Sequence, residues 1–488
     1  YERRNLVTPR GIDLDALAAR LAQDLETLEY PPRDWVVDRH TPAGDPVTDV
    51  VVIGAGMCGL AAAFALKREG ISNIRILDSH PAGLEGPWLT YARMETLRSP
   101  KHLAGPAMGL PNLTFRVWYE SQFGSQAWDS LGKIPRPMWM AYLNWYRQVL
   151  ALPVENDTSV LKISSADHGF DLVIKQGMER QTIAARRIVL ATGRDGMAQP
   201  RVPAALAKVI GPSVRHSSEE IDFAEMRGKN VAVIGFSASA IDNAAEALEA
   251  GAKQVYILVR APQVSRINKM KSTNYPGFTS GFPTLPARAR LELLSYVFRY
   301  RVAPPRDSIL RVFRHPNVDL VLNAPVDHIR QAADGFHVRA GSGQFCVDQI
   351  IYCTGFRIDT LAAEEMRQFA PYIRIFRDSM ADDDDLFSEF LDFPDLGPGF
   401  EFQQKTAGAM PSLSAIHNFT FAATVSHGNV SGDIPCVSDG AVRLAKAIAA
   451  AFFQEDFDHH LADLWTYEDP ELLGNEIPGV TAWKPPLS

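Results

Sequence analysis

The stretch Thr48-Asp-Val-Val-Val-Ile-Gly-Ala-Gly-Met-Cys-Gly-Leu60 decides the fold of this chain. Its apolar run predicts a buried strand, and the Ala/Leu/Lys run that follows predicts a helix. Gly54, Gly56 and Gly59 stand between them with G-x-G-x-x-G spacing, and Ala55 lies inside the turn. Such glycines allow a sharp turn, a close approach of the backbone to a pyrophosphate and tight helix–strand packing. The N-terminus of the helix then attracts the phosphate charge.

The next strand supports the same interpretation. Asn73-Ile-Arg-Ile-Leu-Asp78 ends in a carboxylate roughly twenty residues beyond the glycines, where an acidic side chain accepts hydrogen bonds from a ribose 2′-hydroxyl. A glycine-rich turn without a ligand would leave Asp78 unexplained. We therefore predict a dinucleotide-binding βαβ unit over about 48–78.

Length and composition are those of an ordinary globular protein. The 488 residues are enough for two or three domains, with 46% apolar and 22% charged content. A net charge of −8 gives no basic surface for nucleic acid or anionic lipid. No apolar run reaches the length that spans a bilayer. We expect no nucleic-acid partner, no membrane partner and a cytoplasmic location.

The cysteines argue against several classes of site. Cys58, Cys346, Cys353 and Cys436 are scattered and form no C-x-x-C pair. This spacing disfavours a disulfide framework, a zinc site and a dithiol reductase. We expect no metal.

Two stretches at the N-terminal side predict helices. Residues 13–28 carry leucines at helical spacing with Asp13 as a possible N-cap, so 1–47 is expected to be a helical extension laid on the fold. The stretch 112–150 is rich in aromatic residues and should contain a helix over 138–150. Most of these rings are expected in the core, although they also suit the wall of a pocket.

Two short motifs could meet a cofactor. Gly86-Pro87-Trp88 follows the ribose-binding strand and either places an aromatic ring beside the cofactor or buries Trp88 in the core. Near the C-terminus, a glycine-rich loop over 426–440 precedes a helix. In this loop Gly432 and Asp433 are the candidates for contact with a flavin ring or its ribityl chain.

Two buried strands end in the same pair of residues. Arg187-Ile-Val-Leu-Ala-Thr-Gly193 and Val347-Asp-Gln-Ile-Ile-Tyr-Cys-Thr-Gly-Phe356 both close on Thr-Gly, which brings a backbone turn close to a ligand. The pairs Thr192-Gly193 and Thr354-Gly355 are therefore candidate cofactor contacts. Their repetition suggests two related nucleotide-binding halves.

A second strand-turn-helix begins at Gly228-Lys-Asn-Val-Ala-Val-Ile-Gly235. Its fingerprint is degenerate, because Ser237 stands at the place of the second glycine and Ala240 at the place of the third, with Ser239 between them. Alanine is accepted at the third place, so the match is weaker than the first but still indicates a dinucleotide site.

The strand after this fingerprint ends in a cation. Gln254-Val-Tyr-Ile-Leu-Val-Arg260 places an arginine where the first unit has its aspartate. A cation there suits a ribose 2′-phosphate and favours NADPH over NADH, although a solvated surface arginine is the simpler alternative. A basic cluster follows and either supplements the phosphate site or is a solvated face: Arg266, Lys269 and Lys271.

Together these motifs resemble the class B flavoprotein monooxygenases, which comprise the flavin-containing, Baeyer–Villiger and N-hydroxylating enzymes. The resemblance covers about 48–450. It implies an α/β fold with two Rossmann-like dinucleotide-binding domains, in which the NADPH domain, 206–344, is inserted into an FAD domain made of 48–205 and 345–488. The first fingerprint then binds FAD, Gly86-Pro87-Trp88 is similar to the family's Gly-Gly-x-Trp, and the two Thr-Gly pairs are similar to its linkers.

The subgroup motifs lean in one direction. Thr96-Leu-Arg-Ser-Pro100 resembles the Thr-Leu-Arg-x-Pro of amino-acid N-hydroxylases. The Baeyer–Villiger signature is imperfect, because Gly211 and His216 are separated by one residue too many. We expect N- or S-oxygenation, with Baeyer–Villiger oxidation of a ketone as the alternative.

The resemblance implies that NADPH reduces FAD and that a flavin hydroperoxide transfers one oxygen atom from dioxygen to a small organic substrate. Arg98 and Arg266 are the candidates for stabilising the developing charge. A flavin reductase or oxidase and a non-catalytic dinucleotide sensor are the alternatives of other classes. The expected partners are a small-molecule substrate and dioxygen, and a homo-oligomer is possible.

Overall fold

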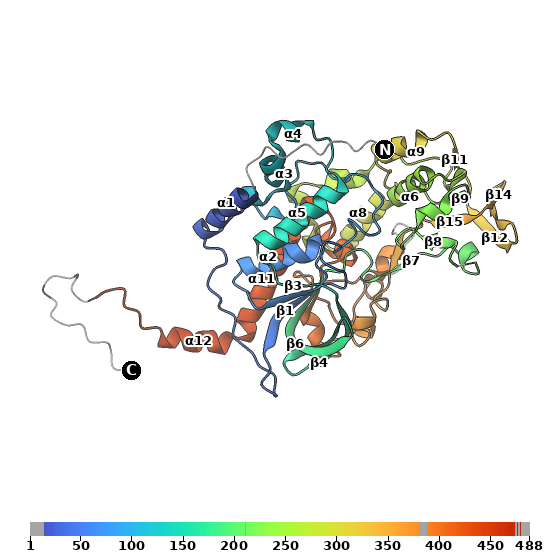
Figure 1. Ribbon diagram of the computed structural model, residues 1–488. Coiled ribbons are helices and arrows are strands. Elements are labelled where there is room, and N and C mark those ends of the chain that lie inside the picture. The colour runs from blue at the N-terminus through green and yellow to red at the C-terminus, as the bar shows by residue number, and fades with distance from the viewer. Residues whose placement is uncertain are drawn as a thin grey trace.

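The computed structural model describes residues 14–209, 211–380, 386, 388–473, 476 and 479. These residues form an α/β fold of two units, each built on a largely parallel sheet (Figure 1). The first sheet has the strand order β3-β2-β1-β6-β5-β4, and β17 also pairs with β6. Its strands are β1 (Val47–Ile53), β2 (Ile74–Leu77), β3 (Val154–Glu155), β4 (Thr158–Ala166), β5 (Gly169–Gln176), β6 (Glu179–Leu190) and β17 (Ile416–Asn418).

The first sheet is covered by helices that the sequence makes apolar. Strand β1 is buried along its whole length. Helix α2 (Met57–Arg68) follows it and is alanine-rich, so it lies close to the sheet on one side and packs against α11 (Val437–Glu455) on another (Figure 1). The helix from the end of the chain thereby covers the start of the fold.

The second sheet has the strand order β11-β10-β9-β15-β8. Its strands are β8 (Val214–His216), β9 (Asn230–Ile234), β10 (Gln254–Leu258), β11 (Val318–Val321) and β15 (Gln349–Tyr352), and its covering helices include α6 (Ala238–Glu249) and α9 (Arg306–Phe313). An antiparallel sheet lies beside it, formed by β12 (Val326–Ala332), β13 (Gly335–Ala340) and β14 (Gly343–Val347).

The second unit is inserted into the first. The chain leaves through β7 (Ala198–Pro200) and returns through β16 (Phe356–Ile358), and these two short strands pair antiparallel. The backbone N–H of Arg201 also donates to the carbonyl of Gly355, 2.9 Å away. The two connections therefore run side by side, and the discontinuous first unit expected from the sequence is confirmed.

One strand lies in a different sheet from the one expected. The stretch 345–356 was assigned to the first unit, but β15 pairs in parallel with β9 and β8 of the second. The reason is that Thr-Gly ends the strand beside the glycine turn in both units, so the motif alone does not say which sheet it joins. The division at residue 345 is therefore one strand too early, and the other domain limits stay predictions.

Peripheral elements follow the sequence patterns with small changes. Helix α1 (Leu14–Thr27) buries Leu17 and Leu21, while the expected cap Asp13 and the acidic run 382–385 lie outside the described residues. The Gly/Pro-rich stretch 274–286 contains α7 (Pro276–Gly281) and a 3₁₀ turn. The remaining helices are α3 (Phe115–Phe123), α4 (Ser125–Ser130), α5 (Arg136–Val149), α8 (Ala287–Arg299), α10 (Thr424–His427) and α12 (Phe457–Thr466).

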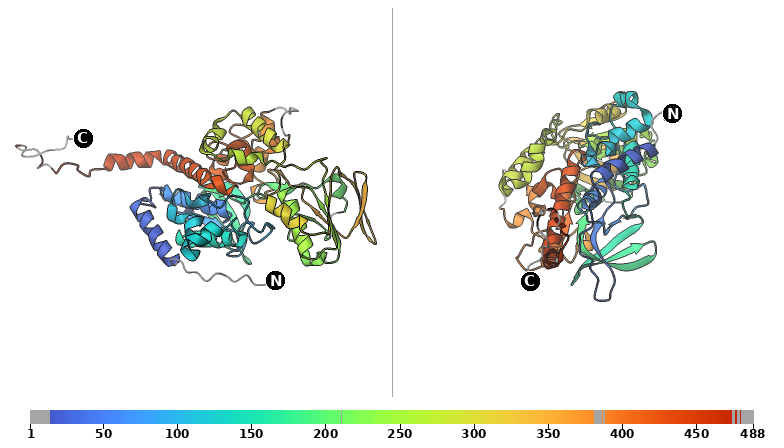
Figure 2. Two further views of the ribbon diagram at one scale, coloured as in Figure 1. Left: turned by 90° about the horizontal axis from the view of Figure 1, so that it is seen from above. Right: turned by 90° about the vertical axis from the view of Figure 1, so that its left-hand side faces the viewer.

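The aromatic region is core. Phe115, Trp139 and Tyr142 are fully buried and their rings pack on one another, with centroids 5.1 to 5.7 Å apart. By contrast, α12 extends from the end of α11 away from the body and buries none of its residues (Figure 2). Among the described helices, none combines the length and apolarity that crossing a bilayer needs.

Candidate active site

The first glycine turn lies where β1, β6 and α2 meet. Gly54 has a φ of +103°, and a Cβ there would stand 2.6 Å from the carbonyl oxygen of Ala191. A Cβ on Gly59 would stand 1.8 Å from the carbonyl oxygen of Gly54. Both positions therefore exclude any larger residue. Gly56 precedes α2 as its N-cap and carries no side chain, which leaves the first turn of that helix open to an anion.

Asp78 lies beside this turn as expected, and its carboxylate is anchored. The backbone N–H of Ala55 donates to Oδ2 at 2.7 Å, and that of His80 donates to Oδ1 at 2.8 Å. The side chain is almost fully buried. Asp78 thus ties the end of β2 to the glycine turn, and its contact with a ribose stays a prediction.

Gly86 and Trp88 also reach the turn. A Cβ on Gly86 would lie 3.6 Å from the Cα of Gly56, so the two glycines face each other closely. Trp88 packs edge-on against Trp139 at 6.1 Å, which is the core contact that the sequence left open. Its Nε1 is buried and has no hydrogen-bond partner among the described residues. A buried donor without a partner beside these two glycines fits a polar group of a bound dinucleotide.

The C-terminal glycine-rich loop comes to the same place. The thiol of Cys58, in the first turn of α2, donates to the carbonyl of Ser431 at 3.3 Å. This contact brings Gly432 and Asp433, both exposed, next to the glycine turn. The charge of Asp433 adds to burial in raising the pKa of the Cys58 thiol to about 12. The loop therefore lies beside the first glycine turn, and the contact of Gly432 and Asp433 with a flavin stays a prediction.

Arg194, which no sequence motif indicated, lies beside this loop together with the expected residues Arg98 and Asp433. Arg194 directly follows Thr192-Gly193, and its guanidinium lies over the ring of Phe421 at 4.3 Å. Its side chain reaches solvent, yet the surrounding protein lowers the pKa of Arg194. In the same way burial raises the pKa of Asp433, while the charges of Arg194 and Arg98 oppose that rise. The protein around these two exposed side chains therefore shifts both pKa values towards the neutral forms.

Thr192 and Gly193 lie at the end of β6, next to Arg194. Gly193 has a φ of +79°, and its carbonyl accepts a hydrogen bond from the N–H of Phe421 at 3.2 Å. The backbone nitrogen of Thr192 lies 3.3 Å from where a Cβ on Gly54 would be. The end of β6 is therefore packed on the glycine turn. The contact of Thr192 and Gly193 with a cofactor stays a prediction.

The second glycine turn repeats this construction. Gly235 has a φ of +124°, and a Cβ there would lie 2.8 Å from the carbonyl oxygen of Cys353, the counterpart of Ala191. Ser237 is extended, with φ −94° and ψ 173°, so this position does not require glycine. Its hydroxyl accepts from the N–H of Ala240 and caps α6. Ser239 accepts a bond from Asn243 at its carbonyl. The second turn therefore keeps the backbone conformation of a dinucleotide-binding turn, although Ser237 replaces the second glycine of the fingerprint.

The second Thr-Gly pair serves the connection between the units. The hydroxyl of Thr354 donates to the carbonyl of Arg201, and the carbonyl of Gly355 accepts from the N–H of the same residue. These bonds hold the two crossing segments together. A contact of Thr354 or Gly355 with a cofactor stays a prediction.

Arg260 has a second arginine beside it. Arg260 is exposed just beyond β10. The hydroxyl of Ser265 donates to the carbonyls of Tyr300 and Arg301, and Arg301 has a φ of +50°. Burial and the charge of Arg260 lower the pKa of Arg301. Arg301 thus has a strained backbone and brings a second positive charge close to that of Arg260. Two neighbouring guanidinium groups are suited to binding a phosphate dianion. The sequence offered no signal for Arg301, because the two arginines are far apart in the chain.

The two catalytic candidates lie in different surroundings. Arg98 pairs with Asp242 of α6, with 3.2 Å between Nη2 and Oδ2, and its charge also acts on Arg194 and Asp433. It therefore stands between the two glycine turns. Arg266 is exposed and neighbours Ser265, whose contacts belong to the 300–301 segment. Of the two, Arg98 has the position of a residue between the cofactor sites.

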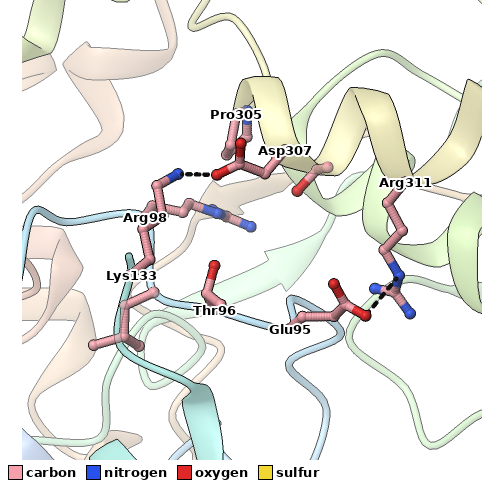
Figure 3. A pocket seen from close by; sticks show the side chains of 9 residues that line it. Glu95, Thr96, Arg98, Lys133, Pro305, Asp307 and Arg311 are labelled. Carbon is pink, nitrogen blue, oxygen red and sulfur yellow. Dashed lines mark ion pairs between the residues drawn. The ribbon is translucent and has the colours of Figure 1, made fainter. Parts of the chain in front are cut away.

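A small cleft opens beside Arg98 at the junction of the units (Figure 3). Ion pairs cross it. Lys133 Nζ lies 2.9 Å from Asp307, and Arg311 lies 3.8 Å from Glu95. The members of each ion pair come from different units, so the two pairs link the opposite walls of the cleft.

His427 in the C-terminal loop is structural. Its ring stacks on Phe400 at 3.8 Å, its Nε2–H donates to the carbonyl of Gly397 at 2.9 Å, and Nδ1 accepts from Arg443 at 3.2 Å. Burial, followed by the charge of Arg443, lowers the pKa of His427 to about 3. The imidazole is therefore neutral at physiological pH and fixes the loop that carries Gly432.

Known proteins share both sequence and fold with this chain. Residues 51–279 match the family model for pyridine nucleotide-disulphide oxidoreductases. The FAD-dependent urate hydroxylase of Xanthomonas campestris pv. campestris is 35% identical over 95% of this chain and 98% of its own length.

Solved structures agree at the level of the fold. The ornithine hydroxylase of Pseudomonas aeruginosa has a TM-score of 0.65 and 15% identity, over 83% of this chain and 99% of that one. The ornithine N-hydroxylase of Kutzneria sp. 744 has a TM-score of 0.65 and 17% identity, over 83% and 100%. The L-lysine 6-monooxygenase of Pseudomonas syringae has a TM-score of 0.60 and 19% identity, over 83% and 99%.

Two glycine turns, each between a buried strand and a helix, are the pattern of a protein that binds two dinucleotides. The chain belongs to the class B flavoprotein monooxygenases. It is an NADPH-dependent flavin monooxygenase with FAD and NADPH as cofactors, and both turns have the backbone that these cofactors require.

Proposed function

We propose that this enzyme hydroxylates urate or a closely related anionic heterocycle. The observation that carries the proposal is the 35% identity to a urate hydroxylase over nearly the full length of both chains. In overall balance, the substrate, dioxygen, NADPH and one proton become the hydroxylated substrate, NADP⁺ and water. FAD supplies the means of activating dioxygen, and the chain supplies position and charge.

The charges at the cavity support an anionic substrate. Arg98 lines the cleft, and its charge acts on Arg194 and Asp433 nearby. Urate is planar and carries a negative charge near neutral pH, so a guanidinium can pair with it in the plane of the ring. Arg98, held by Asp242, orients the anion.

Asp433 is the group suited to moving a proton. Burial raises the pKa of its carboxyl group above the ordinary value, which brings it closer to the working pH. In this proposal Asp433 exchanges a proton with the substrate, and the two arginines keep its ionised form accessible. Gly432 next to it leaves room for the substrate, since a Cβ there would meet nothing within 4 Å.

N- or S-oxygenation is the second candidate. It is favoured by the run Thr96-Leu-Arg-Ser-Pro100, which carries Arg98, and which resembles a motif of amino-acid N-hydroxylases. The likeness to ornithine and lysine hydroxylases concerns the fold only. Baeyer–Villiger oxidation has the weaker motif match. The cytoplasmic location and a homo-oligomer also stay predictions.

The test is a substrate panel with three readouts. NADPH oxidation, dioxygen uptake and hydrogen peroxide release are measured with urate, xanthine, ornithine, a thioether and a cyclic ketone. We expect urate to accelerate NADPH oxidation and to suppress peroxide release relative to the other compounds. Coupled turnover of ornithine or the thioether instead, with no response to urate, would replace the proposal by the second candidate.

A further inference from the structure

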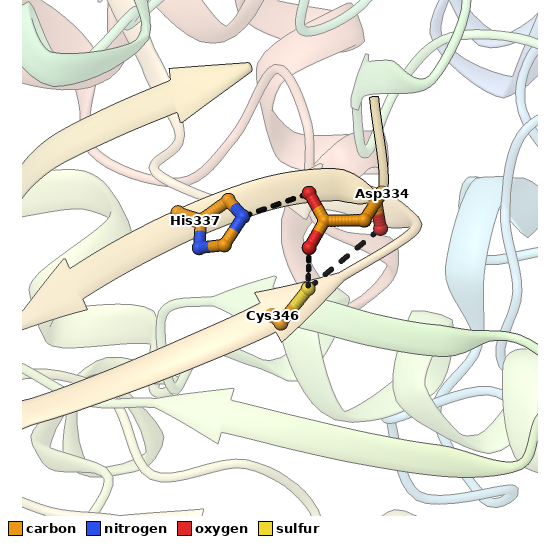
Figure 4. A group of neighbouring side chains, drawn as sticks. All are labelled: Asp334, His337 and Cys346. Atoms are coloured by element: carbon orange, nitrogen blue, oxygen red, sulfur yellow. Dashed lines mark hydrogen bonds and ion pairs between the residues drawn. The ribbon is translucent and has the colours of Figure 1, made fainter. Parts of the chain in front are cut away.

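Three potential metal ligands meet on the antiparallel sheet of the second unit. Strand β13 places His337 directly opposite Cys346 of β14, and Asp334 lies in the turn before β13. Figure 4 shows the carboxylate between the imidazole and the thiol. Its Oδ1 lies 2.9 Å from Nε2 of His337, and its Oδ2 lies 3.9 Å from Sγ of Cys346. The three donor atoms all lie within 4.8 Å of one another.

The backbone that carries these side chains is fixed. Gly335 has a φ of +123°, and a Cβ there would stand 2.6 Å from the carbonyl oxygen of Val347. Phe336 and Val338 alternate with His337 along β13 and are buried against the second unit. The opposite face of the hairpin, with His337 and Cys346, is left towards solvent. The donors are therefore held by a packed sheet and remain accessible.

We propose that Asp334, His337 and Cys346 bind one divalent transition-metal ion, for which Zn²⁺ is the best match. Imidazole, thiolate and carboxylate are the ligands that Zn²⁺ takes in proteins. Tetrahedral Zn²⁺ with bonds of about 2.0 Å to N and O and about 2.3 Å to S places N and O about 3.3 Å apart and S and O about 3.5 Å apart. The observed N-to-O distance of 2.9 Å and S-to-O distance of 3.9 Å each differ from these values by about 0.4 Å. Small rotations of the side chains would remove that difference.

Binding of the metal ion displaces protons from its ligands. The hydrogen bond between His337 and Asp334 occupies the two atoms that the ion would take, and the thiol of Cys346 must also lose its proton. The exposed fourth position is left to water. The sheet lies in the second unit and none of its three donors contacts a glycine turn, so the ion would cross-link β13 to β14 without taking part in oxygenation.

Thiol labelling measures this site directly. All four cysteines lie in the described residues, and Cys346 is exposed whereas Cys58, Cys353 and Cys436 are buried. A disulfide reagent added to the native holoenzyme should therefore label one thiol rapidly. Saturating Zn²⁺ should slow that labelling by about tenfold or more, because a metal-bound thiolate is a poor nucleophile. Mg²⁺ should have no effect, since it prefers oxygen ligands.

Matched variants separate the site from chance binding to a thiol. His337→Gln and Asp334→Asn should abolish the protection, while His328→Gln and Asp327→Asn, on the neighbouring strand β12, should keep it. Co²⁺ added to the wild type should give a thiolate-to-cobalt absorption band that Cys346→Ser removes. Absence of protection in the wild type, or equal protection in His337→Gln, would overturn the proposal. Neither readout depends on oxygenase activity.

Discussion

The guanidinium of Arg98 lies 3.2 Å from the buried carboxylate of Asp242, and this pair joins the two nucleotide-binding units. Asp242 is fixed from its other side, because Ser308 donates to its Oδ1 at 2.7 Å. Arg98 comes from the first unit and Asp242 from the helix that follows the second glycine turn. The cation is thus held at the junction of the two units.

Removing this cation tests its chemical role. We expect Arg98→Met to lower kcat for substrate oxygenation by about 10²-fold, since a charge-stabilising donor in an active site contributes that much. FAD content and anaerobic reduction by NADPH should stay near those of the wild type. Arg116→Met, on the surface of α3, is the matched control. Loss of FAD from Arg98→Met would show that the residue is structural.

The first glycine turn should not tolerate a methyl group. Gly54→Ala would place a Cβ 2.6 Å from the carbonyl of Ala191 at a φ of +103°. We expect the purified variant to lack bound FAD, as measured by its flavin absorbance. Gly44→Ala shares the positive φ, at +90°, but meets nothing within 4 Å. That control should retain FAD, and equal loss from both variants would point to backbone strain in general.

Arg301 should set the preference for the phosphorylated cofactor. We expect Arg301→Gln to raise the KM for NADPH by about tenfold and to leave the KM for NADH unchanged, because only NADPH carries the 2′-phosphate. Arg260→Gln should act in the same direction. Arg306→Gln, an exposed arginine at the start of α9, serves as the control. An equal rise of KM for both cofactors would refute a phosphate contact.

His427 should make the protein sensitive to acid. Its pKa in the fold, about 3, lies below the ordinary value of 6.5, so the unfolded chain binds a proton that the folded chain does not. The stability that the neutral imidazole of His427 contributes to the fold is therefore fully present above pH 6.5, and it is lost as the pH drops from 6.5 towards 3. We expect His427→Gln to flatten the fall of Tm over this range, whereas the exposed His328→Gln should not. A parallel fall in wild type and His427→Gln would contradict this origin.

Local motifs could be predicted from the sequence because their geometry is local. A Cβ would clash at Gly54 and Gly235, which lie in turns, and at Gly59, which lies at the start of α2. Asp78 lies beside the first of these turns. The end of strand β15 was assigned to the wrong unit, because the same Thr-Gly sequence ends a strand in both.

Long-range neighbours could not be predicted. Arg301 reaches Arg260 through a fold in the second unit, and Asp242 meets Arg98 only because the units are packed together. Cys346 lies opposite His337 because β13 pairs with β14, and no C-x-x-C motif in the sequence indicates this neighbour. Such pairs depend on the register of the strands and on the packing of the two units. The hydrophobic periodicity of the sequence carries no information on either.

The most direct test of the account is oxygen transfer itself. The enzyme is given NADPH and urate under ¹⁸O₂, and the product is analysed by mass spectrometry alongside NADPH consumption and hydrogen peroxide release. The account predicts one ¹⁸O atom in each product molecule and one NADPH oxidised for each. Oxidation of NADPH with all the dioxygen recovered as hydrogen peroxide, for urate and for every other compound of the panel, would contradict it.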